Sequence, residues 1–407
     1  MDTNIETLYN YLHNLHHLDN GSRLYDINKS ALQTIKHHGF PSKNNEKWKY
    51  IDIKQYIDNI LLSDPLERNT VAPLESQSNC VIGKNAILLT DGVMTQDLYK
   101  GIKGVNIGVS TNYIKDKNED FILTLNQSSI QNIINIDITD TLKEPLYLTH
   151  TFSNNPLLVS YKININVAKN VSAAITEIFI SNSNINQLIT YDLSINLDDN
   201  AKVENSRFNS INNSSVFLSN ISSIINKEAE FTNINISASK ASLIKNHINC
   251  YLNKDLAKVN LYGLNMINKQ NVVDNQTAVF HNVSNCTSNE LYKYINKNNA
   301  TGIFNGKIYV AKDAQQTQAF QQNKNILLSP DAIIHAQPQL EIFANDVKCS
   351  HGCTIGQLDR ESIFYLKTRG VCEEDAKNML IDAFMSDILE IINDDQLRND
   401  IYKKLHL

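Results

Sequence analysis

The chain has 407 residues, which is long enough for more than one packed unit, since domains typically hold about 100 to 200 residues. Its hydrophobic fraction of 42%, charged fraction of 20%, 13 glycines and 7 prolines are typical of a globular protein and exclude collagen-like and disordered chains. The formal net charge of -6 argues against nucleic acid or an anionic membrane surface as a partner, because both attract positively charged proteins.

The N-terminal segment has no basic stretch followed by an apolar run, and no stretch of about 18 apolar residues follows anywhere. We therefore expect a soluble, cytoplasmic protein. The 6 cysteines are too dilute for a secreted disulfide framework, so we expect reduced thiols. Four of them have no ligand-like neighbours and are interpreted as structural: Cys80, Cys250, Cys286 and Cys372.

Apolar residues recur at helical spacing from Ile5 to Ile35, and Gly39 followed by Pro41 provides a helix stop. We expect an N-terminal helical domain over residues 1–70. Residues 71–145 contain only short apolar runs, which we interpret as strands and loops that lead into the core.

From Leu146 to about Pro338 the hydrophobic period changes to two, and alternation of this kind predicts strands. In one such strand the inward positions are expected to be Val159, Tyr161, Ile163 and Ile165. The turns are rich in Asn, Asp and Ser, and the segment is long for one sandwich. Both features favour a solenoid, with a sandwich or a barrel as alternatives. We assign the β core to residues 146–350.

Helical spacing returns after Gly356. Asp359 is placed to cap a helix that ends at Gly370, and two further helices are predicted over residues 373–392 and 395–405. The middle helix carries an apolar stripe that includes Met379 and Phe384. Such a stripe either packs on its own domain, here residues 351–407, or docks a partner.

Most catalytic signatures are absent, and Gly302–Lys307 has one residue too few between its glycines for a phosphate-binding loop. One cluster of soft ligands is present: Cys349, His351 and Cys353 fall within five residues. Thiolate and imidazole suit zinc, copper(I) and iron-sulfur clusters. Three ligands do not close a metal site, however, and small buried cysteines are often purely structural.

The run from Ala336 to Asp359, AQPQLEIFANDVKCSHGCTIGQLD, resembles the C-terminal signature of SufD-type members of the SufB/SufD family. These proteins are subunits of the SUF machinery for iron-sulfur cluster assembly. Asp274–Thr277 and Glu46–Tyr50 also resemble elements of this family. The equivalent segment of SufB lacks Lys-Cys-Ser-His-Gly, and one departure from the SufD pattern is Cys353, where Ala or Ser is more usual.

The resemblance implies a mainly β protein, with a right-handed parallel β-helix core between N-terminal and C-terminal helical domains. It implies a non-enzymatic scaffold that pairs with a SufB-like subunit through the β-helix and binds a SufC-like ABC-type ATPase through its C-terminal helices. A nascent iron-sulfur cluster would be shared with the partner, and a flavin in the complex is left open. The candidate cluster residues are His351, Cys349 and Cys353, and the candidate partner-binding residues are Phe364, Tyr365, Arg369 and Phe384.

Three alternatives stay open at this point. The chain could be the sister scaffold SufB, or a homodimer formed through the same β edge. It could also be a β-helix enzyme that acts on a polysaccharide through side chains on the solenoid face, although such enzymes are normally secreted.

Overall fold

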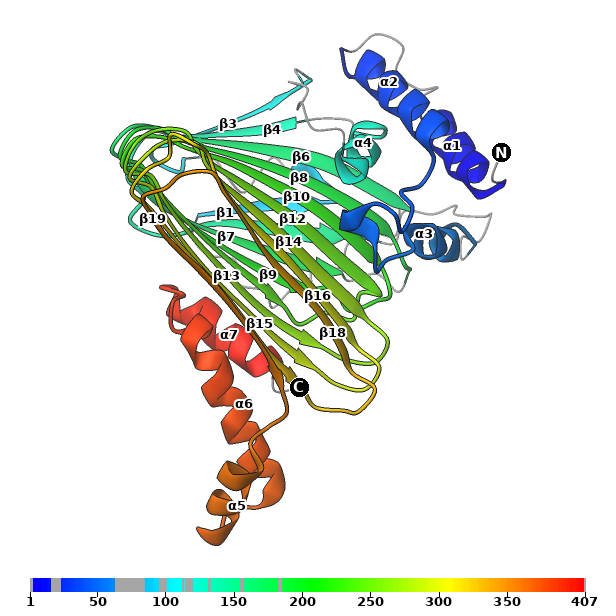
Figure 1. The fold of residues 1–407 in the computed structure, drawn as a ribbon. Coiled ribbons are helices and arrows are strands. Elements are labelled where there is room, and N and C mark those ends of the chain that lie inside the picture. Colours follow the sequence, from blue (N-terminus) through cyan, green and yellow to red (C-terminus); the bar gives the residue numbers. More distant parts are fainter. Residues whose placement is uncertain are drawn as a thin grey trace.

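The computed structural model describes residues 3–15, 23–62, 85–94, 101–111, 113, 120–130, 133–153, 157–181 and 185–405. Within these ranges, a long β-solenoid carries helices at both ends of the chain (Figure 1). The expectation of a mainly β protein with terminal helices is therefore confirmed. Cys80 lies outside the described residues.

The helices are α1 (Thr3–Leu15), α2 (Arg23–His38), the 3-10 helix η2 (Glu46–Trp48), α3 (Ile53–Leu62), α4 (Phe121–Gln127), α5 (Arg360–Thr368), α6 (Glu373–Leu389) and α7 (Asp395–Leu405). Sheet A consists of β1 (Ala86–Thr90), β2 (Val93–Met94), β5 (Leu146–Phe152), β7 (Ser172–Ser181), β9 (Lys202–Ser210), β11 (Glu230–Ser237), β13 (Lys258–Ile267), β15 (Thr287–Asn296), β17 (Thr317–Leu327) and β19 (Val347–Gly356). Sheet B consists of β3 (Val105–Ser110), β4 (Ile133–Ile138), β6 (Leu158–Val167), β8 (Leu188–Leu197), β10 (Val216–Ile225), β12 (Leu243–Leu252), β14 (Val272–His281), β16 (Thr301–Val310) and β18 (Ile333–Ile342).

From β4 onwards the chain alternates between the two sheets, and from β6 onwards each strand pairs in parallel with the strand two positions earlier. The antiparallel pairs in the described strands, β1 with β2 and β3 with β4, lie at the first end of the solenoid. Parallel pairing of this kind forms a β-solenoid, which is the architecture that the sequence favoured over a sandwich. We call the space between the two sheets the lumen.

Asparagine-rich turns join the strands because several of them need a left-handed backbone. Asn170, Asn200, Asn285 and Asn298 all have φ near 60°. Asparagine tolerates this conformation better than most residues. Asn200 also donates a hydrogen bond of 2.9 Å to the side-chain oxygen of Asn170 one coil earlier. The turns therefore stack along one edge of the solenoid with few glycines.

The lumen is lined by rows of inward side chains, one from each coil. Val159, Tyr161, Ile163 and Ile165 on β6 are at most 1% exposed, as the alternation predicts. Ile163 is in register with Ile134 on β4 and Leu193 on β8, so its environment is fully apolar.

Replacing Ile163 by aspartate is expected to lower the free energy of unfolding by about 4 kcal/mol or more, because it places an unpaired carboxylate in an apolar row. Urea denaturation followed by circular dichroism measures this loss. Lys169→Asp, in the exposed turn after β6, serves as the control and is expected to change stability by less than about 0.5 kcal/mol. An Ile163→Asp chain as stable as the control would contradict the assignment of this row to the core.

Helices from both ends of the chain lie on the outer faces of the two sheets, while α5 extends away from the solenoid (Figure 1). Helices α1 to α4 share one apolar cluster with Leu158, Leu188, Val216 and Leu243 of sheet B, in which α4 contacts the strands and α2 packs on α4. The second half of α6 and all of α7 pack on sheet A, where their buried side chains join apolar residues of that sheet that include Ile178, Ile180, Phe208, Ile234, Ile236, Leu264 and Ile295. The apolar stripe on α6 therefore packs partly within the chain, and the surface it packs on is the β core rather than residues 351–407 alone.

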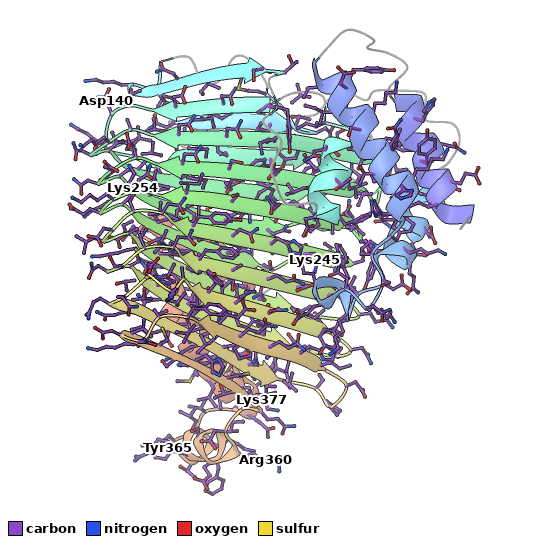
Figure 2. All side chains as sticks on the ribbon, turned by 45° about the horizontal axis from the view of Figure 1, so that its top comes forward. Asp140, Lys245, Lys254, Arg360, Tyr365 and Lys377 are labelled. Carbon is purple, nitrogen blue, oxygen red and sulfur yellow. The ribbon has the colours of Figure 1, made fainter. Side chains whose placement is uncertain are left out.

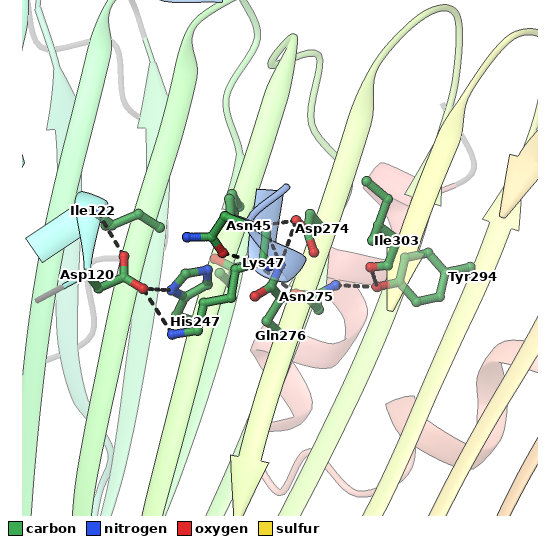
Figure 3. Close-up of polar contacts among 12 residues, drawn as sticks. Asn45, Lys47, Asp120, Ile122, His247, Asp274, Asn275, Gln276, Tyr294 and Ile303 are labelled. Atoms are coloured by element: carbon green, nitrogen blue, oxygen red, sulfur yellow. Dashed lines mark hydrogen bonds and ion pairs between the residues drawn. The ribbon is translucent and has the colours of Figure 1, made fainter. Parts of the chain in front are cut away.

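A polar cluster under η2 fastens the N-terminal helices to sheet B (Figure 3). Lys245 is fully buried, forms an ion pair with Asp274, and donates a hydrogen bond of 2.7 Å to the carbonyl oxygen of Lys47. Gln276 donates to the same carbonyl oxygen at 2.7 Å, and the Lys245 ammonium lies 4.6 Å from the centre of the Trp48 ring. Burial lowers the pKa of Lys245, and the neighbouring Asp274 opposes this effect.

Asp120, the N-cap of α4, forms the second half of this cluster. It accepts a hydrogen bond from the backbone N–H of Ile122 and lies 3.0 Å from Nδ1 of His247 and 3.1 Å from Nζ of Lys47. Burial disfavours its charge, but His247 and Lys47 together hold the pKa of Asp120 well below its ordinary value. Burial also lowers the pKa of His247.

The same N-terminal segment reaches the last coil of the solenoid. Gln339 donates a hydrogen bond of 2.6 Å to Glu46, Gln337 donates one of 2.9 Å to the Tyr50 hydroxyl, and the rings of Tyr50 and His335 stack 3.9 Å apart. Three sequence elements that carry the resemblance, near residues 46–50, 274–277 and 336–339, therefore meet in space. Their role within this chain is to attach the N-terminal segment to β12, β14 and β18.

Candidate functional site

The solenoid ends in two edge strands, β18 in sheet B and β19 in sheet A. None of the residues in these strands is fully buried, and their exposed apolar side chains include Ile333, Ile342 and Ile355. Phe343, directly after β18, is 58% exposed. We call this end of the solenoid the open end. Strand structure continues past residue 350, because β19 runs to Gly356 before Asp359 caps α5.

The soft ligands found in the sequence all lie on β19 at alternate positions, and alternate side chains of a strand share one face. Register identifies that face as the lumen side. The three residues pair with buried residues of β17: Cys349 with Ala319, His351 with Gln321, and Cys353 with Asn323. The Cys353 thiol contacts the side-chain oxygen of Asn323 at 3.5 Å, which agrees with this orientation.

The three side chains share a face but do not converge on one point. Residues four positions apart on a strand, such as Cys349 and Cys353, lie about 13 Å apart, which is too far for both to bind one metal ion. Among the residues that the structure describes, no group of three or more His, Cys, Asp or Glu side chains is arranged to hold a metal ion. The sequence cluster is thus a row of separate donors, with His351 and Cys353 exposed and Cys349 partly buried.

The two thiols are not activated in the chain by itself. Burial raises the pKa of both Cys349 and Cys353 above the ordinary thiol value of 9.0. The thiolate is the form that binds metal, so neither cysteine is primed as a ligand without a further positive group or metal nearby. Cys250 and Cys286 are buried, and Cys372 caps the N-terminus of α6 through its sulfur, in line with the structural interpretation of these three.

The residues proposed from sequence for partner binding lie on two helices with different surroundings. Helix α5 has no buried residue, and Phe364 and Tyr365 are 70% and 58% exposed. Figure 2 shows Tyr365 and Arg360 beyond the body of the solenoid. The guanidinium of Arg369 lies 5.4 Å from the Tyr365 ring centre. Phe384 on α6 is partly buried instead, with the Lys293 ammonium 4.6 Å from its ring centre.

A groove of about 690 Å³ runs beside Phe364 between α5, the first half of α6 and the turn after β17. Its walls include Leu328, Ile363 and Ile381, and its rim carries Lys367 and Glu373, which are 3.0 Å apart. Charged residues such as Lys297, Arg360 and Lys377 line the groove together with the apolar ones, and α5 beside it extends away from the solenoid (Figure 1).

Behind β19 lies a buried polar layer that the sequence analysis did not single out. Glu290 on β15 and Gln321 on β17 face the lumen and are 4% and 1% exposed. The period-two pattern could have placed them there, because Gln321 is two residues from Ala319. The sequence gives no sign, however, that the two are hydrogen-bonded to each other.

Gly302–Lys307, the nearest sequence match to a phosphate loop, lies within the regular strand β16. Phosphate loops need exposed backbone N–H groups at a strand-to-helix turn, and this segment has none of that geometry. Among the described helices, none is long and apolar enough to cross a membrane.

Comparison with known proteins places the chain in one family. Residues 150–384 match the model of the SufBD core domain of the SUF system for iron-sulfur cluster assembly. The chain is 27% identical over 414 residues to the iron-sulfur cluster assembly protein SufD of Escherichia coli, covering 97% of this chain and 96% of the relative. It is also 27% identical to a SufBD family protein of Synechocystis, over 91% of this chain and 88% of that protein. SufD of Plasmodium berghei is 27% identical over 77% of this chain and 23% of its own length.

Proposed function

The chain belongs to the SufB/SufD family of the SUF iron-sulfur cluster assembly system and is of the SufD type, and from this premise we propose that it is a non-enzymatic scaffold subunit on which a cluster is built. The observation that carries the proposal is the open end of the solenoid, where unpaired strand edges present His351 and two cysteines. The cluster is the cargo of this scaffold.

The open end is proposed to pair with a SufB-like subunit. Edge strands offer unpaired backbone N–H and C=O groups, and proteins normally protect such edges or use them for binding. Here β18 and β19 are ten residues long and carry exposed Ile342 and Ile355, and exposed Phe343 follows β18 directly. A second solenoid that ends in the same way could continue both sheets. A homodimer through this edge is the competing arrangement.

His351 is proposed to be this chain's ligand for iron in the growing cluster, with Cys349 and Cys353 beside it for cluster or sulfur handling. Neutral imidazole ligates iron in some two-iron clusters, and thiolates are the usual ligands for the rest. Because the three donors of β19 do not converge, the remaining ligands would have to come from the partner that covers the open end.

Energy for assembly is proposed to come from a SufC-like ABC-type ATPase that docks on α5 and the adjoining groove. The chain carries no phosphate loop of its own in the described residues. A partner helix or loop would find apolar anchors at Phe364 and Tyr365 and a basic group at Arg369. The five cysteines of the described residues are free, which fits assembly in the reducing cytoplasm.

Co-expression with a SufB-type scaffold and a SufC-type ATPase tests the proposal. We expect a complex that contains all three chains and, after anaerobic purification, iron and sulfide; flavin analysis of the same sample decides whether a flavin is bound. Ile355→Arg should reduce recovery of the scaffold partner by more than about tenfold, because it places an unpaired charge in a closely packed interface.

Val109→Arg is the matched control. Val109 is 54% exposed on β3, the edge strand at the other end of sheet B, so pairing should be unaffected. Equal loss of the partner in both variants, or pairing of this chain only with itself, would refute pairing through the open end. Degradation of an acidic polysaccharide by the chain alone would point instead to a β-helix enzyme.

A further inference from the structure

Gln321 crosses the lumen next to the open end and is hydrogen-bonded on one side only. Its amide nitrogen donates to Oε2 of Glu290 at 2.7 Å, while its amide oxygen is buried and has no hydrogen-bond partner in the chain. Buried carbonyl oxygens are nearly always paired, so this orphaned acceptor calls for a donor.

The fold makes room for this side chain. Gly306 of β16, in the opposite sheet, faces the lumen, and a Cβ atom there would lie 2.2 Å from the amide nitrogen of Gln321. A side chain at position 306 would therefore push the amide out of its place. The glycine that the phosphate-loop comparison picked out thus serves to accommodate Gln321.

Glu290 determines the orientation of the Gln321 side-chain amide. Its Oε2 also accepts a hydrogen bond of 3.1 Å from the hydroxyl of Thr277 on β14. Burial raises the pKa of Glu290 to about 7, and the hydrogen bonds from Gln321 and Thr277 oppose this effect. Above that pH the carboxylate is only an acceptor, so the NH2 group of Gln321 must face it. The amide oxygen is then left on the other side.

The lumen-facing side chain next in the row is that of His351. It is in register with Gln321, and register partners of parallel strands lie about 4.8 Å apart with side chains on the same face. The contact between Cys353 and Asn323, two positions along, follows this geometry. His351 has one N–H to donate in its neutral form.

We propose that Gln321, held in place by Glu290, accepts a hydrogen bond from one imidazole nitrogen of His351 and so directs the other nitrogen toward the open end. Gln321 is then a positioning residue for His351. Metal-binding histidines commonly donate their second N–H to an oxygen acceptor, which selects the tautomer and orients the ring. The consequence for iron rests on the proposed function of His351, whereas the hydrogen bond itself does not.

The hydrogen bond is tested on the full-length chain labelled with 15N-histidine, at about pH 8, by the 15N chemical shifts of the His351 ring. His351→Gln identifies the resonances. We expect a single tautomer in the unmodified chain and the mixture of tautomers of free imidazole in Gln321→Leu. Gln322→Leu is the matched control, since Gln322 is exposed on the same strand and points away from the lumen.

Glu290→Gln provides a second variant in case Gln321→Leu does not fold. It keeps the shape of the side chain but can no longer dictate the orientation of the Gln321 amide, so we expect both tautomers. Identical His351 shifts in the unmodified chain and in whichever of these variants folds would overturn the proposal, as would an equal change in Gln322→Leu.

Cluster formation in the co-purified complex provides the functional readout. Loss of a hydrogen-bond partner of a metal ligand typically weakens a metal site by about 10- to 100-fold. Gln321→Leu should therefore lower cluster yield by at least about tenfold. In a chain that already carries His351→Ala, adding Gln321→Leu should lower the yield no further. If the losses of cluster yield in the two single variants add up in the double variant, Gln321 does not act through His351. If His351→Ala alone leaves cluster formation intact, the proposed function of His351 fails, while the 15N shifts still decide the hydrogen bond.

Discussion

Replacing His351 by alanine is expected to lower cluster yield by more than about tenfold while leaving the complex intact, because it removes the imidazole that we propose as this chain's iron ligand. His351 is exposed at the open end, so stability and partner binding should change little. The measurement is iron and sulfide per anaerobically purified complex, together with the recovery of all three chains.

His38→Ala is the control for this experiment. His38 is also an exposed histidine, but it lies at the end of α2, on a helix that packs against α1 and α4 rather than at the open end. It should behave as the unmodified chain does. A normal cluster yield from an intact His351→Ala complex would show that this residue is not part of the assembly site. Loss of the partner subunits in that variant would instead assign His351 to the interface.

The repeating parts of the fold could be predicted because they follow local rules. Alternation placed Val159, Tyr161 and Ile163 on the inner face, and all three are buried. The cap of α5 by Asp359 and its end at Gly370, with φ of 88°, follow from the chemistry of these two residues. Alternation cannot tell how strands pair, however. Assignment of alternate strands to two parallel sheets depends on contacts about one coil apart, which carry no clear repeat in this sequence.

Buried charges in the lumen were not predictable for a related reason. Glu177 is fully buried, with Nε of Arg207 at 3.2 Å, the hydroxyl of Tyr191 at 2.6 Å and Nε2 of His150 at 3.6 Å. Burial disfavours the charge of Glu177, but Arg207 and these neighbours hold its pKa down at about 2. In sequence such residues look like outward polar positions. Each buried charged residue meets its partner only because the strands of successive coils are aligned in a particular register.

The apolar stripe of α6 shows how packing depends on where a helix lies. The spacing places Met379 and Ile388 on one stripe, yet Met379 is 50% exposed and Ile388 is fully buried. The first half of the helix extends past the solenoid with α5, and only the second half reaches sheet A. The exposed half of the stripe therefore does not pack on sheet A, and we propose it as part of the docking surface.

Replacing both Phe364 and Tyr365 by alanine is expected to weaken binding of the ATPase by about 4 kcal/mol, roughly a thousandfold, since exposed aromatic anchors at the centre of an interface often contribute about 2 kcal/mol each. Neither side chain supports the fold, because α5 contains no buried residue. The dissociation constant of the isolated ATPase with the full-length chain, measured by calorimetry, tests this expectation. Thermal unfolding of the variant should match that of the unmodified chain.

Point substitutions test this docking more sharply than removal of the C-terminal helices. Deletion after Gly356 would also uncover Ile234, Ile236 and Leu264 on sheet A, and the exposed apolar face could itself cause aggregation. Tyr402→Ala is the matched control, because Tyr402 is a partly exposed aromatic residue on α7, outside the groove beside α5. Undiminished binding by the double variant would reject docking on α5, and an equal loss in Tyr402→Ala would move the binding surface to the end of the chain.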